Sequence, residues 1–361
     1  MKLYLRRAAV SVATVSLAVV LASCGKDGNT SGTGGVTIGL LLPGAGTPRA
    51  EQFDRPLIEK KIKDLCGDCT VEYANAKENV ATQHQQIHSM VTKGVEVLIL
   101  DPVDAKAARS SVETADRAGI PVVAYDRLAS GPISGYVSFD GEKVGEIQGR
   151  ALLKAMGDKA DGGQIVMMNG SSADPNSAAF KRGALSVLQG KVKIGKAYDT
   201  VEWNPDNAHI NMSGAISALG ADNIDGVYSA NDGLAGGVIS ALRAAKVSPL
   251  PPVTGQDADI TAVQRIVSGE QYMTVYKPFK LEADAAAEMA VALAQGEQLG
   301  DITTDTVDSP TTDDIPAVLL TPTSLTADNI KDTVVKDGMY TIDQICTPKY
   351  KAACERAGLT T

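Results

Sequence analysis

The chain has 361 residues, 44% of them hydrophobic, and a formal net charge of −9. This length exceeds that of one typical domain and predicts two. The acidic balance excludes a surface that could follow a phosphate backbone, so we predict no nucleic-acid partner.

The N-terminus has the pattern of an export signal. Basic residues precede a short apolar run that ends in Leu21-Ala22-Ser23-Cys24. This ending resembles a bacterial lipobox, which implies cleavage before Cys24 and a lipid on its sulfur. The alternative is an ordinary secretory signal that contains a cysteine. We predict a signal peptide over residues 1–23, a Gly-rich tether over 24–35, and an extracytoplasmic protein held at the cell membrane by the lipid alone.

The remaining cysteines are even in number, as expected for disulfides in an oxidising compartment. They are Cys66, Cys69, Cys346 and Cys354. Three pairings are possible, and proximity in the chain favours Cys66–Cys69 and Cys346–Cys354. A redox motif at Cys66-Gly-Asp-Cys69 would have to open a helix after a strand, whereas here it closes a predicted helix. The spacing of the last two cysteines does not suit zinc, so we predict no metal site.

From residue 36 onward, apolar β-branched runs alternate with helical patterns. The predicted strands are 36–42, 70–74, 95–100, 120–125, 136–139, 164–168, 192–197, 226–229, 253–254 and 272–276. The predicted helices are 57–65, 80–91, 105–118, 142–156, 177–188, 205–219, 231–245 and 281–294, with Asp232 as a cap of the seventh. This alternation predicts an α/β fold of two doubly wound parallel sheets, which we expect to be of similar size.

Three breaks in the alternation mark crossings between the two sheets. They lie at residues 129–138, at Lys277-Pro278 and at 309–316. The predicted N-terminal lobe is 36–134 plus 279–312, the C-terminal lobe is 135–278 plus 313–340, and 341–361 is a tail. Three crossings form a hinge with a cleft between the lobes.

Polar side chains follow several predicted strands at the point where each ends. Asp126, Arg127, Asn231, Asp257 and Lys277 take this position, and the loop 171–176 follows another strand. Ligands of open parallel sheets bind outside the carboxyl ends of the strands. Planar acceptors beside fixed donors suit a ligand with several hydroxyl groups.

Trp203, the only tryptophan in the sequence, stands in a polar loop. Its ring could stack on the apolar face of a sugar or plug the surface of the core. Composition alone favours the plug.

Catalytic motifs are absent from the sequence. His84 and His88 stand four apart on a predicted helix, but the zincin pattern is missing, and we expect a solvated face. No nucleophile elbow, P-loop or dinucleotide fingerprint occurs. We therefore predict neither an enzyme nor a cofactor.

Several long motifs carry a resemblance to a known family. They are Ala-Tyr-Asp-Arg (124–127), Ser-Phe-Asp-Gly-Glu-Lys-Val-Gly-Glu (138–146), Trp-Asn-Pro-Asp-Asn-Ala (203–208), Asn-Asp-Gly-Leu-Ala-Gly-Gly (231–237), Gly-Gln-Asp-Ala-Asp (255–259) and Met-Thr-Val-Tyr-Lys-Pro (273–278). From about residue 36 to 336 the chain resembles the bacterial xylose-binding proteins and their sugar-binding relatives. These serve ABC importers and have the type I periplasmic-binding fold.

The resemblance implies a set of sugar contacts, carried over position by position. They are Arg49, Asp126, Arg127, Asp174, Asn176, Trp203, Asn231, Asp257 and Lys277. It also implies that Trp203 is a stacking platform. Where the family has an aromatic residue after the arginine, this chain has Ala50, and we expect Phe53 to supply the ring. The tail from Tyr340 extends past the resemblance.

The implied function is a monomeric receptor that delivers an aldose, D-xylose above all, to an ABC permease. Glucose, galactose, arabinose and ribose are the alternatives. Two other classes share features with this chain. A sugar-responsive repressor would need an N-terminal helix-turn-helix, and an exported hydrolase would need a nucleophile elbow or a metal cluster; the sequence has neither.

Overall fold

The computed structural model describes residues 35–44 and 48–360. The predicted signal peptide, Cys24 and nearly all of the tether lie outside the described residues. Within the described part of the chain, no helix is both long and apolar enough to span a membrane.

The larger sheet has seven strands in the order β10-β11-β5-β4-β3-β1-β2. Every neighbouring pair is parallel except β10 and β11, which are antiparallel. The bounds are β1 Thr37–Leu42, β2 Thr70–Asn75, β3 Val97–Leu100, β4 Val122–Tyr125, β5 Gly135–Phe139, β10 Asp305–Val307 and β11 Ile315–Leu320.

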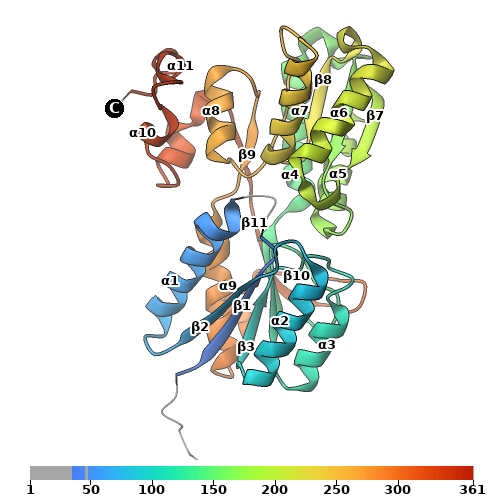
Figure 1. The fold of residues 1–361 in the computed structure, drawn as a ribbon. Coiled ribbons are helices and arrows are strands. Elements are labelled where there is room, and N and C mark those ends of the chain that lie inside the picture. The colour runs from blue at the N-terminus through green and yellow to red at the C-terminus, as the bar shows by residue number, and fades with distance from the viewer. Residues whose placement is uncertain (1–34, 45–47, 361) are drawn as a thin grey trace, which may run out of the picture. The chain divides into compact units, whose positions relative to one another are not determined.

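Helices cover both faces of this sheet (Figure 1). One face packs against α1 (Arg55–Leu65) and α9 (Phe279–Ala294), the other against α2 (Val80–Lys93) and α3 (Arg109–Arg117). In β3, Ile99 joins the core under α1 and α9, whereas Leu98 joins the core under α2 and α3. Because side chains alternate along a strand, a strand covered on both sides is an unbroken apolar run.

The second sheet has three parallel strands, β7 (Lys193–Asp199), β6 (Gln164–Asn169) and β8 (Gly226–Ser229), in that order. The prediction of two sheets of similar size is wrong. Beyond β8 the layer continues only as the single bridge Val227–Val253. Pro251 and Pro252 precede this bridge, and proline has no N–H for a ladder.

The helices of this second region are α4 (Gly141–Met156), α5 (Pro175–Leu188), α6 (Pro205–Leu219) and α7 (Asp232–Ala244). Together with β6 and β8 they share one apolar core. The sixth predicted helix, 205–219, has the same bounds as α6.

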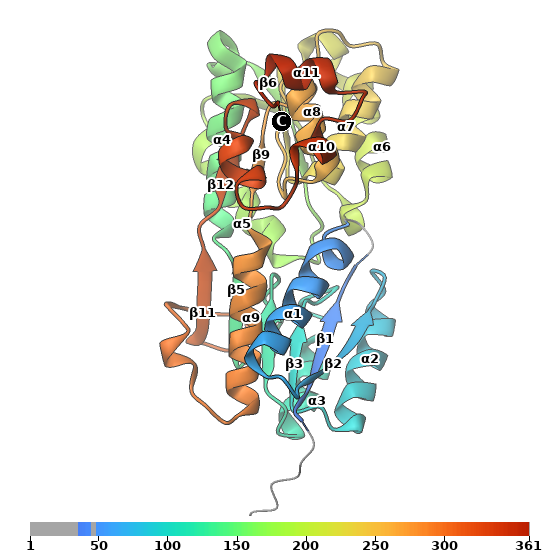
Figure 2. The ribbon, with the colours of Figure 1, turned by 90° about the vertical axis from the view of Figure 1, so that its left-hand side faces the viewer.

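The last part of the chain departs from the predicted pattern. β9 (Thr274–Tyr276) pairs antiparallel with β12 (Thr323–Leu325) instead of extending the parallel sheet. The short helix α8 (Ile260–Ser268) had not been predicted. The tail forms α10 (Ile342–Ile345) and α11 (Lys351–Arg356), which pack against α8 (Figure 2).

Two strands belong to a different sheet than predicted. β5 and β11 are neighbours within the seven-stranded sheet, so the segments 135–139 and 315–320 belong to that sheet and not to the second one. The reason is that β4 connects to β5 without a helix, and this short connection resembled a join between lobes. The third predicted crossing, Lys277-Pro278, lies between β9 and α9.

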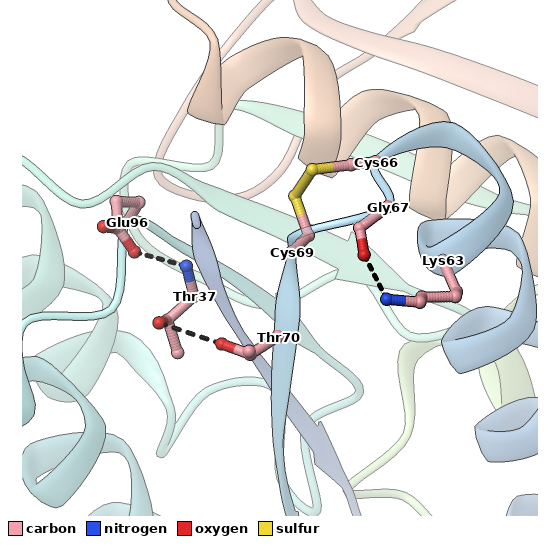
Figure 3. The surroundings of a disulfide bond; sticks show 7 residues. All are labelled: Thr37, Lys63, Cys66, Gly67, Cys69, Thr70 and Glu96. Atoms are coloured by element: carbon pink, nitrogen blue, oxygen red, sulfur yellow. Dashed lines mark hydrogen bonds between the residues drawn. A yellow bond between two sulfur atoms is a disulfide. The ribbon is translucent and has the colours of Figure 1, made fainter. Parts of the chain in front are cut away.

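Two disulfides join the pairs that proximity favours, Cys66–Cys69 and Cys346–Cys354. The first closes the turn between α1 and β2, where Lys63 Nζ also donates to the Gly67 carbonyl (Figure 3). Nearby, the Thr70 hydroxyl donates to that of Thr37 over 3.1 Å. The second lies in the tail, where Cys354 is 1% exposed.

Candidate functional site

All nine predicted contacts line one pocket. It is lined by Pro43, Gly44, Arg49, Ala50, Asp54, Glu78, Asp101, Asp126, Arg127, Asp174, Asn176, Phe180, Trp203, Asn231, Gln256, Asp257 and Lys277. The space open to the centres of water-sized spheres is about 60 Å³. This space is enough for several water molecules.

The pocket collects residues from the carboxyl ends of strands in both sheets. Asp126 and Arg127 follow β4 of the larger sheet and Asn231 follows β8 of the second sheet, whereas Lys277 follows β9, which pairs with β12 outside both sheets. Parallel strands end at the same edge of a sheet, so residues far apart in sequence meet there. This is why the strand-end pattern could identify these residues without knowledge of the pairing.

Two of the predicted contacts also cap helices. Asp174 accepts a hydrogen bond from the Asn176 amide at the start of α5, over 2.8 Å. Asn231 accepts one from the Leu234 amide at the start of α7, over 2.9 Å. The cap of α7 is therefore Asn231, and the prediction that Asp232 fills this role is wrong. Capping holds each side chain in one orientation.

Arg49 lies among three carboxylates. Its guanidinium is 3.0 Å from Asp54, 3.2 Å from Asp126 and 2.5 Å from Glu282. The Phe279 ring lies 4.3 Å from its central carbon, a cation–π distance. Burial opposes the charge, but the surrounding carboxylates outweigh it and raise the pKa of Arg49. Arg49 is therefore a fixed cation at the pocket wall.

Arg127 lies between carboxylates from both sheets. Its Nε is 3.5 Å from Asp101 and 3.0 Å from Asp174. Burial raises the pKa of both acids, although Arg127 opposes the rise. Asp126 differs, because Arg49, Lys277 and Arg127 together outweigh its burial and lower its pKa. Asp126 is thus the carboxylate most firmly held in the ionised form among these three.

Lys277 completes the set of cations. Its ammonium lies 2.7 Å from Asp257, and both side chains are buried. Burial opposes the charge, but Asp257 and Asp126 raise the pKa of Lys277. The pocket lining holds three basic side chains against six acidic ones. This excess of carboxylates disfavours an anionic ligand.

Four buried polar atoms of the lining make no hydrogen bond within the described residues. They are Asp101 Oδ1, Arg127 Nε, Gln256 Oε1 and Asp257 Oδ1. Three are acceptors and one is a donor, and all except Gln256 Oε1 lie in the ion pairs described above. Buried polar atoms are normally satisfied, because leaving one without a partner costs about 1–3 kcal/mol. A ligand with several hydroxyl groups could satisfy all four.

Trp203 forms an apolar wall of the pocket and also joins the core of the second region. Its indole N–H donates to Asp174 over 3.2 Å, and Phe180 meets it edge-on at 6.4 Å between ring centroids. The side chain is 6% exposed. Trp203 thus belongs both to the core of the second region and to the lining of the pocket.

Left-handed backbone conformations concentrate at the pocket. Among the described non-glycine residues with positive φ are Asp126 at 57°, Trp203 at 52° and Asp257 at 97°. Such conformations cost of order 1–3 kcal/mol and persist only where the surroundings fix them. Aspartate tolerates this region better than tryptophan does. The strain shows that the fold holds these side chains in place at the expense of stability.

The structure corrects one expected contact. Phe53 does not line the pocket; its ring packs against Phe279 and Tyr340, at 5.6 and 5.9 Å between centroids. Besides Trp203, the aromatic residue in the pocket lining is Phe180. On α2, His88 is exposed as expected, whereas His84 is half-buried.

Sequence reasoning missed several lining residues, among them Asp54, Asp101 and Gln256. Asp101 follows β3 directly and carried the same strand-end signal as Asp126. Gln256 adjoins a predicted contact. Asp54 had no such signal, because it ends a single π-helical turn (Ala50–Asp54) and reaches the pocket through its bond with Arg49.

Comparison with known proteins places these features in context. A family model described as a periplasmic binding protein domain matches residues 38–298. The D-xylose-binding periplasmic protein of Escherichia coli K12 is 40% identical over 295 residues, which is 80% of this chain and 86% of the relative. A multiple sugar-binding periplasmic receptor of Rhizobium radiobacter is 32% identical, over 86% of this chain and 92% of its own.

The fold also matches solved structures. An ABC transporter solute-binding protein from Clostridium phytofermentans, solved with bound β-D-glucose, is 28% identical with a TM-score of 0.79. The match covers 86% of this chain and 99% of the other. The two-sheet architecture is therefore the type I periplasmic-binding fold.

Proposed function

This chain belongs to the periplasmic binding protein family, and on that premise we propose that it is an extracytoplasmic receptor for a neutral monosaccharide. The receptor delivers its sugar to the permease of an ABC transporter. Members of the family act by binding, so we propose that the protein catalyses no reaction.

The observation that carries this proposal is the set of four buried polar atoms that make no hydrogen bond within the described residues, although three of them lie in ion pairs. Each sugar hydroxyl donates one hydrogen bond and accepts others, so it can satisfy Asp101, Gln256 and Asp257 as well as the Arg127 donor. The nine predicted contacts surround these atoms. We propose that they are the sugar contacts and that the Trp203 ring covers one apolar face of the sugar.

D-xylose is the ligand that we propose first. The support is the 40% identity to a D-xylose-binding protein. Glucose, galactose, arabinose and ribose remain as alternatives, because one displaced side chain decides whether a hydroxymethyl group fits.

Binding would involve two lobes that close on the sugar. We propose that one lobe is built on the seven-stranded sheet and the other on the three-stranded sheet, with crossings after Phe139, at Lys277-Pro278 and after Leu320. Loops of the two lobes already meet. The side-chain amide of Asn176 donates to the Asp126 carbonyl over 2.9 Å, and the backbone N–H of Ala105 donates to the Ala173 carbonyl over 3.2 Å. Release of the sugar would require these bonds to open.

We further propose that the receptor works as a monomer and that a lipid on Cys24 anchors it to the membrane. Both proposals rest on the sequence.

Calorimetric titration with a panel of sugars tests the function. D-xylose, D-glucose, D-galactose, L-arabinose and D-ribose are the candidates, and D-glucuronate is the anionic control. We expect saturable one-to-one binding of at least one neutral sugar and none of D-glucuronate. No binding of any neutral sugar would contradict the proposal.

Variants then locate the site. Asp257→Ala should weaken binding by about tenfold to a hundredfold, since a hydrogen bond to a charged group contributes roughly 1.5–3 kcal/mol. Trp203→Ala should weaken it through lost apolar contact. Asp222→Ala is the matched control, because Asp222 is exposed in a loop that does not line the pocket. Native affinity in both pocket variants would place the ligand elsewhere.

A further inference from the structure

Asp232 follows a proposed sugar contact, Asn231, yet does not line the pocket and is only 1% exposed. We propose that Asp232 is a positioning residue: it holds the loop 255–259 in the conformation that directs Asp257 at the sugar. This inference rests on the proposed function and deepens it, because it assigns the origin of the site's geometry to a residue that does not touch the ligand.

Asp232 binds the loop on both sides of Asp257. Its backbone N–H donates to the Gln256 carbonyl over 3.0 Å. Its carboxylate Oδ2 accepts from the Asp259 N–H, also over 3.0 Å. The two residues between these bonds, Asp257 and Ala258, have φ values of 97° and 56°. One residue thus fixes both ends of the strained segment.

Thr274, in β9, joins the same carboxylate to the middle of the loop. Its hydroxyl donates to Asp232 Oδ2 over 2.9 Å and accepts from the Ala258 N–H over 3.2 Å. The Asp257 N–H donates to the Val275 carbonyl over 2.9 Å. The loop is therefore held between the start of α7 and β9. Two consecutive residues with left-handed backbone conformations persist only where the surrounding structure fixes them.

The other carboxylate oxygen is also occupied. Gln271 Nε2 donates to Asp232 Oδ1 over 2.7 Å, and Arg265 donates to the Asp232 carbonyl over 2.8 Å. Gly255 lies directly against this oxygen, since a Cβ there would come within 2.0 Å of Oδ1. The close approach leaves the Asp232 carboxylate no room to move and leaves the loop no room for a side chain at position 255.

The contrast with Asp257 supports the division of roles. Each oxygen of Asp232 accepts a hydrogen bond from the protein, whereas Asp257 Oδ1 makes no hydrogen bond within the described residues and is paired with the Lys277 ammonium at 2.7 Å. Asp232 is held by the loop and does not line the pocket, whereas Asp257 lines it. A fully satisfied buried network rigidifies the segment it holds.

The test titrates Asp232→Ala with the cognate sugar and follows the fluorescence of Trp203, the only tryptophan in the sequence. We expect affinity to fall by about tenfold or more, the equivalent of one lost charge-assisted hydrogen bond. Leu152→Ala is the control: Leu152 is a buried core residue near Gly226, at the opposite end of β8 from Asn231. It should lower the melting temperature without changing affinity.

A second pair of variants keeps the inference testable if Asp232→Ala does not fold. Thr274→Val removes only the hydroxyl that joins Asp232 to Ala258, and it should weaken binding several-fold. Thr274→Ser keeps that hydroxyl and should restore the affinity.

The double variant Asp232→Ala/Asp257→Ala separates positioning from a general loss of stability. If Asp232 acts through Asp257, the double variant should bind about as weakly as Asp257→Ala alone. Additive losses would overturn the inference, as would native affinity in Asp232→Ala or Thr274→Val. If the wild-type protein binds no sugar, both the proposed function and this inference fail. If the wild-type protein binds and these variants bind equally well, the inference alone fails.

Discussion

Gly170 illustrates how one missing side chain shapes the pocket. It follows β6, and a Cβ at this position would lie 2.0 Å from the six-membered ring of Trp203. Real Cβ atoms do not approach so closely, so any other residue must displace the indole. The glycine is thus required by packing and not by its backbone conformation.

We expect Gly170→Ala to displace the Trp203 ring, to weaken sugar binding and to shift the tryptophan emission to longer wavelength, because the displaced ring meets more water. Emission spectra and calorimetry measure the two effects. Gly214→Ala is the control, since a Cβ there would meet only one atom, at 3.8 Å, in the middle of α6. It should leave binding unchanged and stabilise the helix slightly. An unshifted emission with native affinity in Gly170→Ala would contradict this prediction.

At the scale of elements, the first turn of α9 places an acid in the core beneath the pocket. Glu282 is fully buried, and its Oε2 accepts from Arg49. Burial raises the pKa of Glu282 to about 8, and Arg49 only partly opposes this rise. The folded protein therefore holds this proton more tightly than the unfolded chain does.

This difference predicts a pH dependence of stability. Because the folded pKa lies above the unfolded value of 4.5, the protonated Glu282 contributes its full stabilisation of the folded state below pH 4.5. This stabilisation is lost as the pH rises to about 8, and above that pH it changes no further. We expect the melting temperature of the sugar-free protein to fall over this range, and Glu282→Gln to reduce the fall.

Thermal melts at successive pH values measure this effect. Glu288→Gln is the matched control on the same helix, because the Glu288 carboxylate is accessible to solvent and pairs with Lys61 at 2.6 Å. Its profile should parallel that of the wild type. A parallel profile for Glu282→Gln as well would refute the assignment.

The tail packs against α8 and contains its own disulfide. Cys354, Ile345 and Leu359 pack with Val263 and Ile266 of α8 in one apolar cluster. The Cys346–Cys354 bond closes a short loop, and closing a loop of this size constrains the unfolded chain by about 2–3 kcal/mol. The bond therefore stabilises a cluster that lies beside the Asp257 loop.

We expect Cys346→Ser/Cys354→Ser to lower the melting temperature more than Cys66→Ser/Cys69→Ser, whose loop is shorter and less buried. Differential scanning calorimetry compares the two. Thiol labelling of the denatured, unreduced protein should find no free thiol at the four positions. Labelling at all four would show that the bonds do not form in the cell.

For the whole molecule, we expect the wild-type protein to partition with membranes and Cys24→Ala to be released. The reason is that Leu21-Ala22-Ser23-Cys24 resembles a lipobox, and the lipid is the proposed anchor. Fractionation and mass spectrometry of the N-terminus measure this. Cys66→Ser should stay with the membrane. A wild-type protein found wholly in the culture fluid, without an acyl group, would exclude the anchor.

Much of the architecture could be predicted because it depends on local pattern. The order of strands and helices up to about residue 245 follows from apolar periodicity, which each segment carries by itself. The residues after β4 and β8 could be identified for the same reason, since the end of a buried strand is visible in the sequence. The two cysteine pairings that were favoured are also local, and the structure forms both.

Pairing between distant segments could not be predicted in this way. The sequence contains the strand 315–320, but only the fold shows that it lies beside β5, and only the fold limits the second sheet to three strands. The helix α8 was missed because it has only nine residues and follows an irregular loop.

The sequence by itself determined the class of fold, the positions of the strand-end residues and, through its long motifs, the resemblance to sugar receptors. Only the tertiary structure decided which charges meet. Arg49 and Asp54 flank one helical turn, and Glu282 lies more than two hundred residues later in α9, yet the three form one buried network. The same holds for Asp232, which looks like a helix cap and instead holds the loop of Asp257. Local pattern reports burial, whereas the partners of a buried charge depend on contacts between segments far apart in the chain.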